Sequence, residues 1–406
     1  MDEIDGVKLM TRAFSTRAAR AAIDTDPAFG AVVPPLVLSA TFSFDGLDGK
    51  RRYDYSRSGN PTRDQLGDAL ASLEGGAGAV VTSTGTAAAT LVLHALLEPG
   101  ERLLVPHDCY GGSWRLFTAL AAKGCFELES CDFSDARALE AAIARKPNLV
   151  WIETPSNPLL RITDIAAASA AARAVGAKVV ADNTFMSPAL QRPIEHGADI
   201  VIHSTTKYIN GHSDVVGGAA IARDPAIAEQ LGWWANALGL TGSPFDSYLT
   251  LRGLRTLDAR MRIQQANCAA IAEILVEHPA VLAVHYPGLA NHPGHEVAAR
   301  QQEGFGAMLS FDLRGGKEAA RAFVEGLGCI TLAESLGGIE SLIAYPVTMS
   351  HAVLSEEERL RAGIGPGLLR LSVGVEHIDD LVDDVTAGLE RVARLSVTPV
   401  SDGAAS

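Results

Sequence analysis

The chain of 406 residues is long enough for two domains and a large core, with 47% hydrophobic and 20% charged residues. Its formal net charge of −14 argues against nucleic acid and anionic membranes as partners, because both are polyanions. The five cysteines are odd in number and lack Cys-x-x-Cys spacing, which favours a reduced, cytoplasmic protein over a disulfide scaffold or a zinc site.

Residues 1–57 show no alternation of strand and helix patterns. They contain no apolar core of a signal peptide, and no run in the chain reaches the roughly 18 apolar residues that span a bilayer. A segment that cannot bury its own apolar side chains packs on its own domain or on another subunit. We therefore predict that residues 1–57 form an N-terminal arm that packs on its own domain or contacts a neighbouring subunit.

Residues 58–265 alternate between short apolar runs and stretches rich in Ala and Leu with helical spacing. This alternation predicts a large α/β domain in which helices cover a mostly parallel sheet. The predicted strands are 77–82, 102–106, 148–153, 178–181, 200–203 and 217–222, and the predicted helices include 86–97, 114–123 and 165–175.

Residues 266–395 are predicted to form a smaller C-terminal α+β domain. Residues 253–267 have the pattern of a helix that enters this domain. Residues 306–313 alternate like a half-exposed strand, and residues 368–372 form another strand. The tail 396–406 is small and polar, and we predict that it is disordered.

The predicted strand 200–203 is followed by Ser204, Thr206 and Lys207. Ligands of an open parallel sheet bind beyond the carboxyl ends of its strands. A lysine at this place is either a salt-bridged surface residue or a nucleophile that attacks a carbonyl. The Ser-x-x-Lys spacing also matches penicillin-binding enzymes, but their Ser-Asp-Asn and Lys-Thr-Gly motifs are absent and the spacing here ends a strand.

Asp182 follows the predicted strand 178–181, about one helix and one strand before Lys207. This separation places both side chains at the same edge of the sheet. The carboxylate has two interpretations. It caps the next helix, or it holds a proton on a heterocyclic nitrogen.

Gly85 and Thr86 form a turn between a predicted strand and a predicted helix. Glycine lets the backbone approach a ligand, and the free N–H groups at a helix start attract a phosphate, although an ordinary strand-to-helix turn has the same pattern. The hydroxyls of Ser204 and Thr206 would reach the same phosphate if the two strand ends are neighbours. A lysine, a carboxylate and a phosphate cradle at one edge match the needs of pyridoxal 5′-phosphate.

Three further side chains are candidates for ligand contacts. Tyr110 stands beside glycines that would let its ring lie flat on a planar cofactor, and Asn157 is held between two prolines. Arg370 lies in the apolar strand 368–372. A tyrosine of this kind is as readily an ordinary core residue, whereas an inward-facing arginine is costly unless it pairs with a carboxylate, such as that of a substrate.

The sequence lacks the motifs that are typical of two other classes of ligand site. The chain has no Gly-x-Gly-x-x-Gly and no P-loop motif, so neither dinucleotide nor P-loop binding is predicted. His292 and His295 stand near Glu296, but Pro293 and Gly294 break any helix that would align them. We therefore predict no metal site.

Together these motifs resemble the Cys/Met-metabolism family of pyridoxal-phosphate enzymes. The resemblance covers residues 10–395 and implies an aspartate-aminotransferase-like fold of type I, with a large, mostly parallel seven-stranded sheet and a smaller C-terminal α+β domain. The motifs that carry it are 53–57, 59–63, 108–112, 153–158, 182–185, 203–214, 233–236, 332–338 and the strand with Arg370.

The resemblance implies how pyridoxal phosphate would be held. Lys207 would carry the cofactor and move protons, and Asp182 would pair with its ring nitrogen. Tyr110 would stack on its ring and help activate the amine or thiol. The active unit would be at least a dimer, commonly a homotetramer, with the active site shared between two subunits. The phosphate would be bound by Gly85, Thr86, Ser204 and Thr206 of one subunit, with Tyr55 and Arg57 of its neighbour.

The resemblance also assigns the substrate contacts. Arg370, with Asn157 and Ser335, would hold the α-carboxylate of an amino-acid substrate. Glu334 and Asp54 would meet a distal amino group. Arg115 would bind the distal carboxylate of a succinyl group.

The activity implied is a γ-replacement in methionine biosynthesis and transsulfuration, in which O-succinyl-L-homoserine or O-acetyl-L-homoserine and L-cysteine give L-cystathionine. The alternative is γ-elimination of cystathionine to cysteine, 2-oxobutyrate and ammonia, because the same residues can run both reactions. Methionine γ-lyases of this family carry a cysteine where Gly112 stands, which argues against that activity. Ser58 stands where enteric-type members have an arginine, which leaves the choice of leaving group open.

Two further classes of protein are less compatible with the sequence. A nicotinamide-dependent oxidoreductase would need the glycine fingerprint that is missing. A non-catalytic relative would have no need to keep Lys207, Asp182, Tyr110 and Arg370 together.

Overall fold

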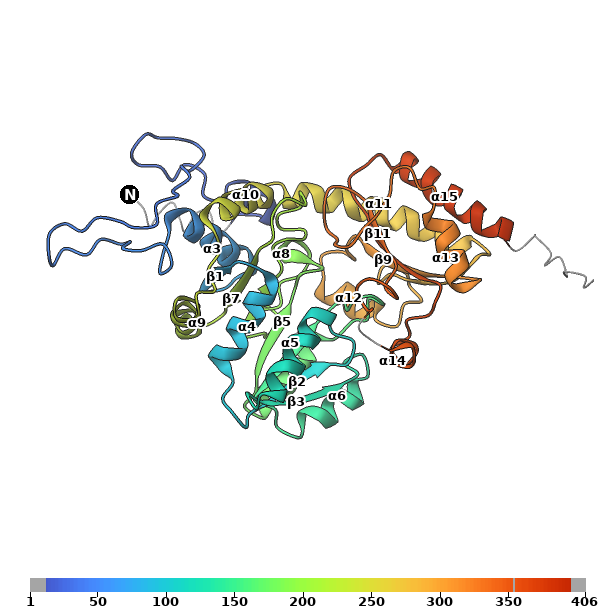
Figure 1. The fold of residues 1–406 in the computed structure, drawn as a ribbon, viewed down its shortest axis with the longest axis horizontal. Helices are drawn as coiled ribbons and strands as arrows, with labels where there is room; N and C mark the ends of the chain where they lie inside the picture. The colour runs from blue at the N-terminus through green and yellow to red at the C-terminus, as the bar shows by residue number, and fades with distance from the viewer. Residues whose placement is uncertain (1–11, 353–354, 396–406) are drawn as a thin grey trace, which may run out of the picture.

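The computed structural model describes residues 12–352 and 355–395. The predicted disorder of 396–406 and the first eleven residues of the predicted arm lie outside these ranges. The described residues form two sheets, each packed against its own helices (Figure 1). Among them, no helix has the length and apolar character needed to cross a membrane.

The large sheet has seven strands in the order β1-β7-β6-β5-β4-β2-β3. β7 runs antiparallel to both of its neighbours, and the other pairs are parallel, so the predicted mostly parallel seven-stranded sheet is confirmed. The strands are β1 (Gly78–Thr82), β2 (Arg102–Pro106), β3 (Glu127–Cys131), β4 (Leu149–Glu153), β5 (Lys178–Asp182), β6 (Ile200–His203) and β7 (Gly218–Ala222).

Helices cover both faces of this sheet, which explains why its central strands are almost continuously apolar. One face packs against α4 (Gly85–Leu96), α5 (Gly111–Ala122) and α9 (Pro225–Leu238). The other face packs against α3 (Pro61–Glu74), α6 (Ala136–Ile143), α7 (Ile165–Ala174), α8 (Ser187–Leu190) and α10 (Pro244–Leu254).

Local capping fixes where the helices next to the site begin. The side chain of Thr84 accepts the N–H of Ala87, which starts α4 directly after β1. The side chain of Asn60 accepts the N–H groups of Thr62 and Arg63 at the start of α3. The Thr84 cap holds the first turn of α4 at the carboxyl end of the sheet.

The smaller sheet has the order β10-β11-β12-β9-β8, and its core is continuous with that of α11 and the C-terminal helices. Its strands are β8 (Val281–His285), β9 (Met308–Leu313), β10 (Thr331–Leu332), β11 (Leu342–Ala344) and β12 (Leu368–Ser372). Its helices are α11 (Leu257–Glu277), α12 (His295–Gln301), α13 (Gly316–Val324), α14 (Glu356–Arg361) and α15 (Ile378–Leu395).

Two sequence predictions for this region are wrong. β9 is buried on both faces rather than half-exposed, because Ser310 on its second face donates to the carbonyl of Pro158 from the large-sheet side. The predicted helix 253–267 is interrupted, since α10 ends at Leu254 and α11 begins at Leu257. The Thr256 hydroxyl donates to the carbonyl of Gly253, and such a side-chain bond competes with helical pairing.

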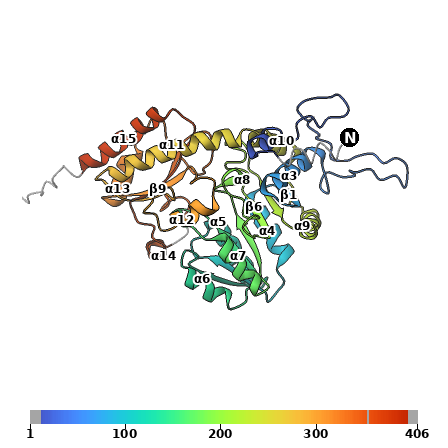
Figure 2. The same ribbon diagram turned by 180° about the vertical axis from the view of Figure 1, so that it is seen from behind.

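α11 links the two parts of the molecule, since it starts beside α10 on the large-sheet side and extends along the smaller sheet in both views (Figure 1, Figure 2). The predicted boundary between residues 265 and 266 falls inside this helix. The division of the chain at that residue stays a prediction.

The N-terminal segment begins with α2 (Phe14–Ala19), which packs on α3 and α11. The chain between α2 and α3 then projects from the large-sheet side of the molecule (Figure 1, Figure 2). Phe29 and Leu47 on this projecting arm are 89% and 98% exposed. Apolar side chains so exposed are typical of a surface that another chain covers.

Candidate active site

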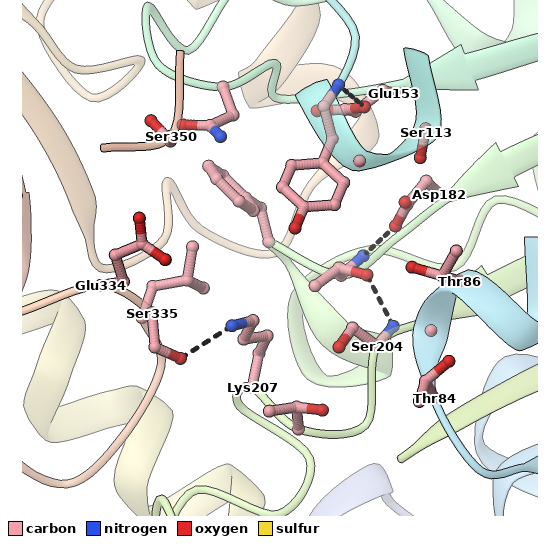
Figure 3. Close-up of a pocket in the computed structure, with 18 of the residues that line it drawn as sticks. Thr84, Thr86, Ser113, Glu153, Asp182, Ser204, Lys207, Glu334, Ser335 and Ser350 are labelled. Atoms are coloured by element: carbon pink, nitrogen blue, oxygen red, sulfur yellow. Dashed lines mark hydrogen bonds between the residues drawn. The ribbon is translucent and has the colours of Figure 1, made fainter. Parts of the chain in front are cut away.

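Lys207 lies just past the end of β6, and its side chain points into a cavity of about 680 Å³ (Figure 3). Its Nζ donates a hydrogen bond to Oγ of Ser335 at 2.7 Å. It forms no ion pair within the described residues, so the surface salt bridge that the sequence allowed is not formed. Burial and, to a smaller extent, the charge of Arg370 together lower the pKa of Lys207 to about 8, while Glu334 opposes both effects.

The lowered pKa of Lys207 predicts that replacing this lysine stabilises the cofactor-free protein, by an amount that depends on pH. The unfolded chain binds this proton more tightly than the folded protein, so stability rises with pH from about 8 to the ordinary lysine pKa of about 10.5. Lys207→Met should therefore unfold with a free energy about 3 kcal/mol higher than wild type below pH 8, a gain that fades across that window. Urea unfolding of wild type and Lys207→Met at several pH values measures this gain in the free energy of unfolding. A gain that does not change with pH would contradict the expectation.

Asp182 ends β5 and faces the same cavity. Its Oδ1 accepts the N–H of Thr184 at 3.0 Å, while the hydroxyl of Thr184 accepts the N–H of Ser204 at 2.9 Å. The Asp182 carboxylate therefore orders the turn that follows its own strand and does not cap α8, which starts at Ser187. Burial raises the pKa of Asp182, and the hydrogen bonds from Thr184 and the nearby His203 act against that rise.

The turn at the start of α4 lies against the turn after β6. A Cβ atom placed on Gly85 would lie 2.8 Å from Cβ of Ser204, so only glycine allows this approach. The hydroxyl of Thr206 accepts the N–H of Gly217 at 3.0 Å and also lines the cavity, as Thr86 does. The structure thus brings Gly85, Thr86, Ser204 and Thr206 together, although β7 separates β1 from β6 in the sheet.

Tyr110 lines the cavity from the start of α5, and its side chain is 44% exposed. Its N–H donates to Oε2 of Glu153 at 2.8 Å. A Cβ atom on Gly112 would overlap the Tyr110 ring, so this glycine makes room for the ring position.

Gly112→Ala should therefore displace the Tyr110 ring and lower kcat/KM by about 10- to 100-fold, as small errors of position near the chemistry do. Steady-state kinetics measure the change. The matched control is Gly232→Ala, because a Cβ atom at Gly232 meets nothing within 4 Å. Equal kinetics for the two variants would contradict the steric account.

Arg370 lines the same cavity as Lys207 and is 4% exposed. Its Nη1 donates to Oδ1 of Asn157 and its Nη2 to the carbonyl of Ser335, both at 2.9 Å. Its Nε is buried and has no hydrogen-bond partner in the described part of the chain. Such a donor is available to a ligand with acceptor oxygens, such as a carboxylate.

Ser335 joins the two cations of the site. Its hydroxyl accepts from Lys207 and its carbonyl accepts from Arg370. Its φ of +96° is unusual for a residue with a side chain, and strain of this kind is found at functional sites. Glu334 and Arg115 line the same cavity.

The structure does not bring Asp54, Tyr55 and Arg57 into this cavity. Tyr55 is 50% exposed on the arm, and Arg57 donates to Oδ1 of Asn236 at 2.9 Å. Asp54 pairs with Lys50 at 2.9 Å, and hydrogen bonds from Lys50 and Ser58 lower the pKa of Asp54 to about 2. The predicted roles of these three residues stay predictions.

Sequence reasoning missed some residues of the cavity wall. Glu153 ends a buried strand as Asp182 does, and that position was a signal that could have identified it. Thr184 and Ser350 have no comparable signal, since they lie in turns whose neighbours only the fold decides.

The donor set fits pyridoxal phosphate. A half-buried lysine, a carboxylate at the neighbouring strand end and a glycine turn at a helix start surround one cavity, as an enzyme of the pyridoxal-phosphate class requires. The chain belongs to the Cys/Met metabolism family of PLP-dependent enzymes, whose model matches residues 15–390.

Individual relatives agree with this family. The chain is 55% identical over 379 residues to the cystathionine gamma-synthase of Escherichia coli (strain K12). The aligned region covers 93% of this chain and 98% of the relative. The chain is 64% identical, with a TM-score of 0.93, to the cystathionine gamma synthase of Xanthomonas oryzae pv. oryzae in complex with cystathionine, covering 94% and 99% of the two chains. A cystathionine gamma-lyase from Lactobacillus plantarum complexed with L-serine is 41% identical, with a TM-score of 0.91 and coverage of 94% and 100%.

Proposed function

We propose that this chain makes L-cystathionine from O-succinyl-L-homoserine and L-cysteine by a pyridoxal-phosphate-dependent γ-replacement. The Cγ–O bond breaks and releases succinate, and a Cγ–S bond forms. The observation that carries the proposal is the double contact of Ser335, which sets the proton-transferring Lys207 beside the carboxylate-binding Arg370. The higher identity to synthases than to the lyase supports replacement over elimination.

When bound, pyridoxal phosphate supplies an electron sink that lets C–H bonds beside the substrate's amino group ionise. Lys207 would hold the cofactor and Asp182 would keep its ring nitrogen protonated. Tyr110 would stack on its ring. The turn at Gly85 and Thr86, with Ser204 and Thr206, would bind its phosphate, since a helix start and nearby hydroxyls favour anions.

Lys207 would also move the protons that the reaction requires at more than one substrate carbon. A base that takes and returns protons near neutral pH needs a pKa close to that pH, and the pKa of about 8 is suited to it. The hydroxyl of Ser335 would steer the amine as it moves between these carbons.

Arg370 and Asn157 would bind the α-carboxylate, and the free Nε of Arg370 gives that carboxylate a donor. Glu334 would meet the amino group of the incoming cysteine. Arg115 would hold the distal carboxylate of the succinyl group, which O-acetyl-L-homoserine lacks.

The arm implies that the site is completed by a second subunit. Tyr55 and Arg57 lie outside their own cavity on an exposed segment with uncovered apolar side chains, as expected if they reach the phosphate of a neighbour, with Asp54 beside them. We propose a homotetramer built as a dimer of dimers. A cytoplasmic location accords with five cysteines that are all free.

A steady-state comparison tests the proposal. O-Succinyl-L-homoserine, O-acetyl-L-homoserine and cystathionine are each supplied with and without cysteine, and cystathionine and 2-oxobutyrate are quantified. We expect cystathionine formation to be fastest with the succinyl ester and cysteine. Rapid 2-oxobutyrate release from cystathionine with negligible synthesis would instead identify a lyase.

A further inference from the structure

Glu153 brings a second carboxyl group into the cavity beside Asp182 (Figure 3). The two residues end neighbouring parallel strands and are Cα partners in the ladder between β4 and β5. Partners in register point their side chains to the same face of a sheet. Two carboxylates so placed oppose each other's ionisation.

Glu153 is 6% exposed, and backbone N–H groups are its donors. Its Oε2 accepts the N–H of Tyr110 at 2.8 Å, and the N–H of Asn157 also donates to this carboxyl. Tyr110 directly precedes α5, and Asn157 contacts Arg370. Glu153 therefore fixes two separate segments that line the cavity.

No cation forms an ion pair with Glu153 among residues 12–352 and 355–395. The nearby Arg161 is bound to Asp108 at 2.9 Å, and Lys207 and Arg370 donate to other groups. An ionised Glu153 would thus be a buried charge without a counterion, which is costly. The titratable groups that act on it are Asp108, Cys109 and Asp182.

We propose that Glu153 works as an uncharged carboxylic acid that holds Tyr110 and Asn157 in place and leaves a single negative charge on Asp182. Glu153 is then a positioning residue of the site. The inference rests on the proposed function, which gives Asp182 the ring nitrogen of the cofactor. Pairs of carboxyl groups in unlike environments commonly divide acid and base states in this way.

The electrostatics of the two residues point the same way. Burial and then the negative charge of Asp182 raise the pKa of Glu153 well above its usual range, and they outweigh the backbone N–H groups of Tyr110 and Asn157, which lower it. Asp182 accepts hydrogen bonds from the N–H and the hydroxyl of Thr184, which stabilise its charged form. The proton shared by the pair therefore belongs to Glu153.

Infrared difference spectroscopy tests the protonation state directly. Wild type and Glu153→Gln are compared at a pH of about 8, where ordinary carboxyl groups are ionised. We expect wild type to show the carbonyl stretch of a protonated acid and the variant to lack it. Spectra that superimpose in this region would overturn the proposal.

The second arm compares two carboxyl-to-amide changes on adjacent strands. Asp182→Asn should weaken the binding of pyridoxal phosphate to the cofactor-free protein by at least about tenfold, because it removes a charge. Glu153→Gln keeps the length and an acceptor oxygen, so its binding should weaken by less than about threefold. Equal losses in the two variants would show that Glu153 is charged and would overturn the proposal. Circular dichroism verifies that both variants are folded.

If the variants do not fold, the proposal can still be tested by NMR on wild-type protein with ¹³C-labelled glutamate carboxyl groups. One resonance should keep the shift of a protonated acid at a pH of about 8, and its absence would overturn the proposal. Neither spectroscopic readout requires turnover. A wild type that makes no cystathionine but shows the acid signal would refute the proposed function and leave the state of Glu153 established.

Discussion

Lys207→Ala is expected to lower turnover of every amino-acid substrate by about 10⁴-fold or more, while the protein stays folded. The loss is large because one amine would both hold the cofactor and move the protons, and alanine can do neither. Folding should survive, since the change removes a buried cation that lies beside Arg370. Steady-state kinetics and thermal unfolding measure the two effects.

The matched control for that variant is Lys178→Ala. Lys178 is exposed at the first residue of β5, at the opposite end of the sheet from the site, so its kinetics should stay within about twofold of wild type. Borohydride reduction in the presence of pyridoxal phosphate should attach the cofactor to wild type and to Lys178→Ala at residue 207 but not to Lys207→Ala. Wild-type turnover in Lys207→Ala would refute the role of this amine.

Arg370→Ala is expected to lower kcat/KM for O-succinyl-L-homoserine by about 10³-fold, because a buried carboxylate contact is lost. Arg370→Lys should recover little of this loss. An ammonium group cannot donate to Asn157, to the Ser335 carbonyl and to a substrate in the fixed geometry of a guanidinium.

Cofactor binding separates this effect from general damage to the site. Both Arg370 variants should bind pyridoxal phosphate with an affinity within about threefold of wild type, because the proposed partner of Arg370 is the carboxylate of the substrate and not the cofactor. Arg314→Ala, a change at an exposed arginine after the neighbouring strand β9, serves as the control. A loss of kcat/KM below about tenfold in Arg370→Ala would argue against the carboxylate assignment.

Much of the large sheet could be predicted from the sequence, because buried parallel strands are continuous apolar runs. β2 and β6 have the predicted bounds, and β4 differs by one residue. β3 is the strand that the apolar pattern did not predict. It lies at the sheet edge with Glu127 and Ser130 exposed, so its sequence lacks such a run, and only the family resemblance implied a seventh strand.

The places of the site residues could be predicted from the sequence where these residues stand at the end of a strand. Lys207, Asp182 and Gly85 stand at carboxyl ends of strands, and these ends meet at one edge of a sheet. Contacts between distant segments carry no such signal. The bond from Lys207 to Ser335 joins the two sheets across the cavity, and the backbone strain at Ser335 is visible only in the structure.

The contacts of the N-terminal arm beyond its own chain follow neither from the sequence pattern nor from the fold of one chain. Tyr55 is exposed and Arg57 donates to Asn236 outside the cavity, so their predicted contact with the phosphate of a neighbouring subunit stays a prediction. Gly112 could be identified as a notable position from the sequence. The reason that a glycine stands there, the overlap of any Cβ atom with the Tyr110 ring, is visible only in the fold.

The central claim is that a Cγ–S bond forms in the cavity above Lys207. The most direct measurement supplies O-succinyl-L-homoserine with isotope-labelled cysteine and follows the label by mass spectrometry. The account predicts that labelled cystathionine is the main product and that succinate is released in equal amount. Unlabelled 2-oxobutyrate, ammonia and succinate as the only products, with the label still in free cysteine, would contradict it.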